Sequence, residues 1–359
     1  MNSENNCHSA YSLNGRQQTL LDIIRIVAAL FVLVGHSFSY YQLTMFKDQT
    51  YFPYLQNIGV VIFFLLSGFL MALSLENKNQ KHEYTFLMFF KHKTIRISRE
   101  YIPGLILIAC IDYISILINA QDYGYYKWFN IEHFIGNIFM LQSMGPYAIF
   151  SKVLITFGSG RPLWCLSVEW WFYMLFGAAY IYIANKKKLT LSKILVLGVS
   201  IFMSSGYLIN GRGNGLGMVF TLGMLCYYSY YLIDNRKLSV MICLLSVMLY
   251  TVYGVVCKEA YTIYSFIILW IFLSASLRCT GGNTCALKRN KVLAFISKST
   301  FMLYLIHYSI IDFIYTWQID LSIYSKFYIG IIISLLCSFL AYYIFGEKRL
   351  LERIITKAR

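Results

Sequence analysis

Long apolar stretches recur along the whole chain, and they restrict its fold more than any other feature of the sequence. Each stretch is roughly 18–23 residues long, enough for a helix to cross a hydrocarbon layer about 30 Å thick. The stretches are continuous rather than alternating, so they predict transmembrane helices and not a β-barrel. The composition agrees, because 58% of the 359 residues are hydrophobic and only 13% are charged.

The sequence therefore predicts an all-α, polytopic integral membrane protein with about ten transmembrane helices. Residues 1–359 are expected to form one membrane domain, with no second domain. Segment 120–160 is expected to lie along the outer surface, with a short interfacial helix around 131–141. The expected spans are residues 20–40, 57–75, 101–119, 162–184, 191–209, 215–233, 238–256, 261–277, 293–316 and 324–345.

The basic residues indicate how the chain is oriented. A net charge of +15 is typical of proteins that bind nucleic acid, but here the cations lie in short clusters between apolar runs, so no nucleic-acid partner is expected. With the N-terminus inside, 23 of the 31 Lys and Arg residues fall in inner segments and seven in outer segments. This asymmetry predicts that both terminal tails, residues 1–19 and 346–359, are cytoplasmic.

Arg25 and His36 are ionisable residues within the first expected span, where a charge is costly and each such residue is a candidate functional residue. Eleven residues of α-helix turn through almost three full turns, so both side chains share one face, about 16–17 Å apart along the axis. The alternatives are an arginine that reaches the membrane interface and a histidine that only packs. The shared face favours a functional pair.

Two further groups of polar residues lie near the expected membrane boundaries. Glu169 lies at a depth comparable with that of His36, where a carboxylate can orient an imidazole; the alternative is a structural ion pair with Arg161. On the cytoplasmic side, Arg96 and Arg99 are three residues apart, and two guanidinium groups on one helical face suit a phosphate. The alternative for this pair is ordinary membrane anchoring.

The ninth expected span contributes His307 in its outer half and Tyr304 one turn below it. His307 is either a second catalytic group or a packed, hydrogen-bonded histidine, and the sequence does not favour one reading. No metal site is expected, because the cysteines are scattered and lack histidine or acidic neighbours.

These motifs, taken in order, resemble the acyltransferase-3 family of integral membrane acyltransferases, and the resemblance covers nearly the whole chain. The resembling segments are LDIIRIVAALFVLVGHS with its Arg-x10-His spacing, GVVIFFLLSGFLMA with Ser67, the Arg-x-x-Arg of RISR, LWCLSVEWWFY with Glu169, and YLIH with Tyr304 and His307.

The resemblance implies acyl-CoA, most often acetyl-CoA, as donor and a cell-surface carbohydrate of bacteria as acceptor, possibly lipid-linked. O-antigen, capsule and exopolysaccharide are acceptors of this kind. It places the protein in the bacterial cytoplasmic (inner) membrane, in contact with lipid.

The pantetheine arm of acyl-CoA has about the length of the Arg25-to-His36 separation. We therefore expect the nucleotide to lie near Arg96 and Arg99, and the thioester near His36. His36 is the expected general base, and a covalent acyl-histidine is a variant of this mechanism. Glu169 is expected to orient His36, and Ser67, Tyr304 or His307 to stabilise the oxyanion. The catalytic residues are thus predicted to be His36, Glu169, Ser67, Tyr304 and His307, and the donor-binding residues to be Arg25, Arg96 and Arg99.

Two alternatives remain at this stage. A transporter or flippase would also combine many spans with buried charges and a basic cytoplasmic face. Within the enzymes, the donor could instead be succinyl-CoA, and the acceptor a small molecule or a lipid.

Overall fold

The chain folds into a bundle of α-helices in the computed structural model. The model describes residues 13–43, 55–79, 84–143, 154–184, 188–208, 215–233, 235–281, 288–317 and 321–346. Within these ranges the regular structure is helical and contains no strand. The ends of both expected tails, residues 1–12 and 347–359, lie outside the described residues, as does part of the expected outer segment, residues 144–153.

The helices follow one another along the chain with short connections. One short helical turn, η1 (Tyr126–Trp128), precedes α4. The others adjoin α5, α7 and α11 and are η2 (Arg161–Leu163), η3 (Tyr180–Ala184), η4 (Tyr230–Leu232) and η5 (Tyr342–Gly346). The α-helices are α1 (Gly15–Tyr40), α2 (Leu55–Asn79), α3 (Phe86–Asn119), α4 (Ile131–Ile138), α5 (Trp164–Ala179), α6 (Leu191–Leu208), α7 (Leu216–Ser229), α8 (Arg236–Cys257), α9 (Ile263–Thr280), α10 (Lys291–Thr316) and α11 (Ile323–Ala341).

Each expected span coincides with a helix, and the expected interfacial helix is α4. In the described part of the chain, seven helices are long and apolar enough to cross a membrane: α1, α2, α3, α8, α9, α10 and α11 with its extension. Helices α6 and α7 are apolar but shorter. The protein is therefore a multi-pass, all-α membrane protein. The total of ten spans and the orientation remain predictions.

Helix α3 begins at Phe86, well before the start of the expected span at residue 101, and contains that span. Thr85 caps it by accepting a hydrogen bond from the backbone N–H of Met88 at 3.3 Å. The charged stretch before the apolar run is therefore helical. Consequently, its cationic side chains have fixed positions on one rigid element instead of lying in a loop.

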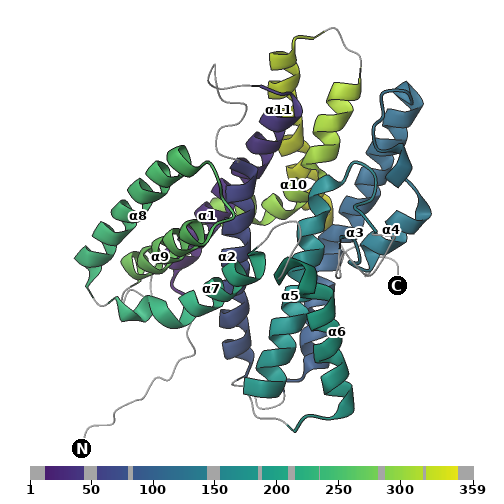
Figure 1. Ribbon diagram of the computed structural model, residues 1–359. Coiled ribbons are helices and arrows are strands. Elements are labelled where there is room, and N and C mark those ends of the chain that lie inside the picture. The colour runs from purple at the N-terminus through teal and green to yellow at the C-terminus, as the bar shows by residue number, and fades with distance from the viewer. Residues whose placement is uncertain are drawn as a thin grey trace, which may run out of the picture.

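Helix α2 lies at the centre of the bundle, between α1 on one side and α7 on the other (Figure 1). Two glycines allow these contacts. A Cβ on Gly59 would lie 2.5 Å from the carbonyl oxygen of Ala28 in α1, and a Cβ on Gly68 would lie 2.0 Å from that of Phe220 in α7. Small residues at helix contacts let backbones approach closely, as is common in membranes.

Helices α1 and α10 pack along much of their length and run in the same direction. Residues near the start of each meet one another, as Arg25 and Ser297 do. Residues near the end of each also meet, as Tyr40 and Asp312 do. The α8–α9 pair lies on one side of this core, and α3, α5 and α6 lie on the other (Figure 1).

Candidate functional site

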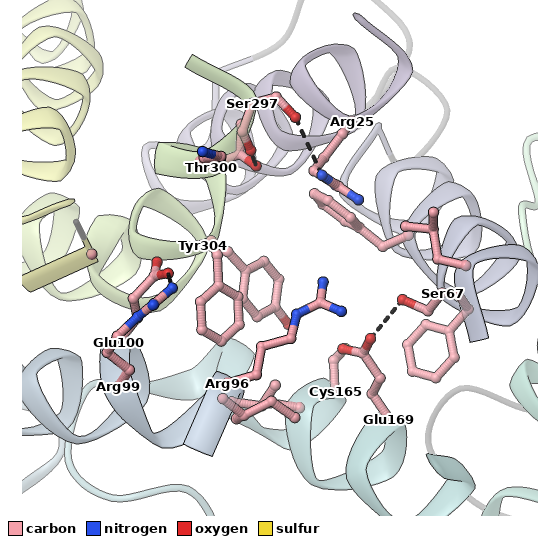
Figure 2. A pocket seen from close by; sticks show the side chains of 18 of the residues that line it. Arg25, Ser67, Arg96, Arg99, Glu100, Cys165, Glu169, Ser297, Thr300 and Tyr304 are labelled. Atoms are coloured by element: carbon pink, nitrogen blue, oxygen red, sulfur yellow. Dashed lines mark hydrogen bonds and ion pairs between the residues drawn. The ribbon is translucent and has the colours of Figure 1, made fainter. Parts of the chain in front are cut away.

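A cavity of about 610 Å³ lies between α1, α2, α3, α5 and α10. Its walls bring together residues that are more than 200 positions apart in the sequence (Figure 2). Six of the eight predicted site residues line it: Arg25, Ser67, Arg96, Arg99, Glu169 and Tyr304. The two histidines are not among the lining residues and lie beyond Tyr304.

Arg25 and His36 both face α10, which confirms the predicted shared face of α1. The Nη1 atom of Arg25 donates a hydrogen bond to the Oγ of Ser297 at 3.3 Å. The ring of His36 lies 5.4 Å, centroid to centroid, from those of both His307 and Tyr308. Because α1 is one continuous helix, its two ends carry these residues to opposite ends of the same helix contact.

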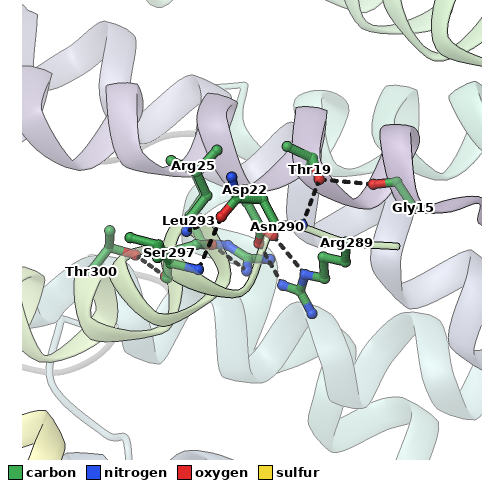
Figure 3. Close-up of polar contacts among 10 residues, drawn as sticks. Gly15, Thr19, Asp22, Arg25, Arg289, Asn290, Leu293, Ser297 and Thr300 are labelled. Atoms are coloured by element: carbon green, nitrogen blue, oxygen red, sulfur yellow. Dashed lines mark hydrogen bonds and ion pairs between the residues drawn. The ribbon is translucent and has the colours of Figure 1, made fainter. Parts of the chain in front are cut away.

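A buried ion pair fixes the start of α1 to the segment that leads into α10 (Figure 3). The Nε and Nη2 atoms of Arg289 donate to the two oxygens of Asp22 at 2.6 and 2.5 Å. The side chain of Asp22 is almost fully buried. A bidentate pair of this kind has a defined geometry. It therefore holds Arg25, one turn further along α1, at the cavity wall.

Glu169 has partners other than His36. The hydroxyls of Ser67 and Tyr173 donate to its Oε1 atom at 2.5 and 2.6 Å. Tyr173 lies one turn after Glu169 on α5, so both side chains share a face, and Ser67 reaches them from α2. In the described residues Glu169 has no hydrogen bond or ion pair with His36 or with Arg161. Glu169 thus joins α2 to α5 at the cavity wall.

Helix α3 carries a row of charged side chains along the cavity. Arg99 lies 3.8 Å from Glu100, and this pair is at the edge of the cavity (Figure 2). Arg96 points instead towards the space between Tyr304 and the Ser67–Glu169 pair. Lys93, one turn earlier, is 7% exposed, and its ammonium group lies 3.8 Å from the ring centroid of Tyr173. The sequence analysis did not single out Lys93. Lys93 lies three residues before Arg96, so continuing the same helical face towards the N-terminus would have identified it.

The cavity carries an excess of positive charge. Six basic and two acidic side chains line it. The ion pairs in the described part of the chain involve Arg99 and Arg289, so Arg25, Lys93 and Arg96 have no carboxylate partner there. A partly buried cation without a counter-ion is unfavourable unless a ligand neutralises it. The arrangement is therefore suited to bind an anion with several charges.

His307 lies beside His36 and is completely buried. Its Nδ1 atom is 3.0 Å from the carbonyl oxygens of both Leu303 and Tyr304. Carbonyl oxygens only accept hydrogen bonds, so Nδ1 carries the hydrogen and Nε2 carries the lone pair. The Nε2 atom has no hydrogen-bond partner within the described residues. The local backbone thus fixes the tautomer and leaves a basic nitrogen available next to His36.

The three predicted oxyanion donors already have acceptors for their hydrogens. Ser67 donates to Glu169. Tyr304 donates to the carbonyl oxygen of Pro162 at 2.5 Å. His307 holds its only N–H against the α10 backbone. Either hydroxyl can turn to a new acceptor, but His307 in this tautomer can only accept.

Comparisons with known proteins identify the family of the chain. The family model described as an acyltransferase domain, acyltransferase-3, matches residues 19–343. The O-acetyl transferase of Shigella phage Sf6 is 26% identical to the chain over 247 residues, which cover 65% of this chain and 69% of the phage protein. No solved structure matches the chain significantly. The chain therefore belongs to the acyltransferase-3 family, which confirms the resemblance of the motifs, and its enzyme class is that of an O-acetyltransferase.

Proposed function

We propose that the protein moves an acetyl group from cytosolic acetyl-CoA to a hydroxyl of a cell-surface carbohydrate, at the outer side of the bacterial cytoplasmic membrane. The acceptor is a glycan such as O-antigen, capsule, exopolysaccharide or a lipid-linked precursor. One observation carries the proposal. Six cations line the cavity, and those of Arg25, Lys93 and Arg96 have no carboxylate partner in the described residues; Tyr304 in the cavity wall lies 6.1 Å from His307, ring centroid to ring centroid.

The donor's nucleotide is the polyanion that the cavity suits. Its phosphates would bind Arg96 and Lys93, with Arg99 at the edge of the site. Arginine offers a planar, bidentate fork to phosphate and lysine a compact point charge, so the two cations differ in what they contribute. Neutralisation by phosphate offsets the cost of holding the buried Lys93 ammonium away from water.

The pantetheine arm would extend from the phosphates past Arg25 and Tyr304 towards the histidines. Tyr304 lines the cavity, and its ring centroid is 6.1 Å from that of His307. His307 in turn lies 5.4 Å from His36. Arg25 and His36 are about three helical turns apart, roughly 16–17 Å along the axis. This separation is about the length of the arm, so the thioester would lie near His36.

His36 acts as the general base in this proposal. It takes the proton of the acceptor hydroxyl as the oxygen attacks the thioester carbonyl. The new C–O bond forms, the C–S bond breaks, and the imidazolium returns its proton to the departing CoA thiolate. Ser67 and Tyr304 remain the proposed oxyanion donors, and one of these hydroxyls turns from its present acceptor to the thioester oxygen.

His307 replaces Glu169 as the residue proposed to orient the base. Its ring lies 5.4 Å from that of His36, centroid to centroid, and its Nε2 atom has no hydrogen-bond partner in the described residues. The described bonds of Glu169 go instead to Ser67 and Tyr173. An acceptor nitrogen beside an imidazole N–H fixes the tautomer of that imidazole, much as a carboxylate does in a triad. Glu169 would instead position Ser67.

The proposal is tested with purified protein in detergent, acetyl-CoA, and surface polysaccharide from which alkali has removed the ester groups. We expect free CoA thiol to appear together with acetylated polysaccharide, the latter measured by mass spectrometry. A parallel reaction with succinyl-CoA tests the donor. A protein that binds acetyl-CoA but neither cleaves it nor labels the polysaccharide would contradict the proposal and favour a transporter.

A further inference from the structure

His36 is reachable from a direction other than the donor cavity. It is partly exposed, yet it does not line that cavity, whereas His307 is fully buried. Two of the aromatic rings around His36 and its neighbour Tyr308 are also partly exposed, those of Tyr40 and Tyr125. A second substrate can therefore approach the base from this side.

The residues on this side form a compact group, which we call the outer cluster: Tyr40, Tyr125, Arg161, Tyr308 and Asp312. They come from α1, from the segment after α3, from η2 (Arg161–Leu163) and from α10. The group arises because Tyr40 follows His36 by four residues on α1, and Asp312 follows Tyr308 by four on α10. One helical turn beyond His36 on α1 and beyond Tyr308 on α10, each helix thus carries a polar side chain on the same face as the earlier residue.

Contacts within the outer cluster leave its rings next to the base. Tyr308 meets His36 edge to face at 5.4 Å and Tyr40 at 5.5 Å, measured between centroids. The hydroxyl of Tyr125 donates to that of Tyr308 at 3.3 Å. Arg161 is exposed and lies against the hydroxyls of Tyr125 and Tyr308.

The cluster also holds an unused hydrogen-bond acceptor. Asp312 is 2% exposed and accepts a hydrogen bond from Tyr40 on one oxygen, but its Oδ2 atom has no partner among the described residues. The neighbouring buried carboxylate, Asp112, differs. The backbone N–H and the hydroxyl of Ser159 donate to its two oxygens, at 2.8 and 2.5 Å. An unsatisfied buried carboxylate oxygen is unfavourable unless a ligand donates to it.

We propose that the outer cluster binds the sugar residue that receives the acyl group and presents one of its hydroxyls to His36. A sugar ring offers C–H faces to aromatic rings, hydroxyls that donate to a carboxylate, and oxygens that accept from guanidinium and tyrosine O–H groups. The outer cluster holds each of these complements beside the base. This inference rests on the proposed function and assigns the acceptor to the side of His36 opposite the donor.

The test uses the full chain, acetyl-CoA and the alkali-deacetylated surface polysaccharide, with KM measured for each substrate. Tyr125→Phe removes one hydroxyl and keeps the ring, and Arg161→Gln removes the guanidinium. We expect the polysaccharide KM to rise about three- to tenfold for Tyr125→Phe and about tenfold or more for Arg161→Gln. The KM for acetyl-CoA and the rate of acetyl-CoA hydrolysis without polysaccharide should stay within twofold of wild type.

Two neighbours on the same segment provide matched controls. Tyr126 is 68% exposed and lies outside the outer cluster, and Lys127 is an exposed cation beside it. Tyr126→Phe and Lys127→Gln should leave both KM values unchanged. Asp312→Asn is a third variant, which keeps the shape of the side chain and should raise the polysaccharide KM alone.

The outcomes separate the inference from the function it rests on. An active wild type whose Tyr125→Phe and Arg161→Gln variants keep their polysaccharide KM would overturn the outer cluster as the acceptor site. Equal rises in both KM values would also overturn it, because they would indicate a structural role. A wild type that releases CoA but never labels polysaccharide would contradict the proposed function itself.

Discussion

The two ends of the contact between α1 and α10 differ in charge and in packing. At the Arg25 end, the helices border an open cavity lined by six cations and two carboxylates. At the His36 end, aromatic and imidazole rings lie about 5–6 Å apart between centroids, and most hydroxyls already have acceptors. The first arrangement favours a large anion and the second favours a precise geometry for neutral groups. The same helix pair can therefore bind a donor at one end and perform chemistry at the other.

The largest expected effect is at the His36 end. His36→Ala removes the proposed base, and general-base catalysis contributes typically 10²–10⁴-fold, so turnover should fall to about 1% or less of wild type. Specific activity per folded molecule is the measurement, with folded protein quantified by size-exclusion chromatography. A stably folded variant that keeps more than about a tenth of the activity would show that His36 is not the base.

A smaller effect is expected at the cationic end, where Arg96 and Arg99 are not equivalent. Arg96 has no ion pair with any residue that the structure describes, whereas Arg99 lies 3.8 Å from Glu100. Arg96→Ala should raise the Kd for acetyl-CoA about ten- to hundredfold, because one or two charge-assisted hydrogen bonds are lost. Arg99→Ala should raise this Kd less. Isothermal titration of both variants decides this. If both variants bind acetyl-CoA with wild-type affinity, the cavity is not the donor site.

Arg25 should behave as part of the cavity and not of the chemistry. Arg25→Ala should lower kcat/KM for acetyl-CoA about tenfold, because one charged hydrogen-bond donor along the path is lost. Arg25→Lys should recover only part of this, since an ammonium group cannot reproduce the planar fork. Full recovery in the lysine variant would mean that charge alone matters at this position. Matched steady-state kinetics on the two variants provides the comparison.

Salt should separate the two ends in the wild-type enzyme. Added salt screens charges over a Debye length of about 10 Å at 0.1 M, so the acetyl-CoA KM should rise several-fold as ionic strength increases. The polysaccharide KM should rise less than this, because the outer cluster carries one cation, Arg161, whereas six cations line the donor cavity. Equal salt dependence of both KM values would contradict the contrast between the two ends.

Features that depend on one helix were predictable from the sequence. Apolar length located the helices, and the 100° rotation per residue placed Arg25 and His36 on one face, which both residues turn towards α10. The expected third span, residues 101–119, lies within α3, but hydropathy indicates where a helix crosses lipid and does not locate the start of the helix. A charged stretch with a Thr85 cap continues the helix into the polar region.

Features that depend on how helices face one another were not predictable. Glu169 and His36 were expected to meet because they lie at similar depths, but depth does not determine the rotation of α5 about its axis. The carboxylate turns to Ser67 and Tyr173 instead. The contact between His307 and His36 is a second example, because it depends on how α10 packs against α1.

The measurement that tests the account most directly is the acetyl-CoA affinity of folded His36→Ala. If donor binding belongs to the cavity at the Arg25 end and chemistry to the histidine pair, this inactive variant should bind acetyl-CoA with a Kd within twofold of wild type. A loss of affinity as large as that expected for Arg96→Ala, about tenfold or more, would contradict the account, because the two ends could then not be assigned separate tasks.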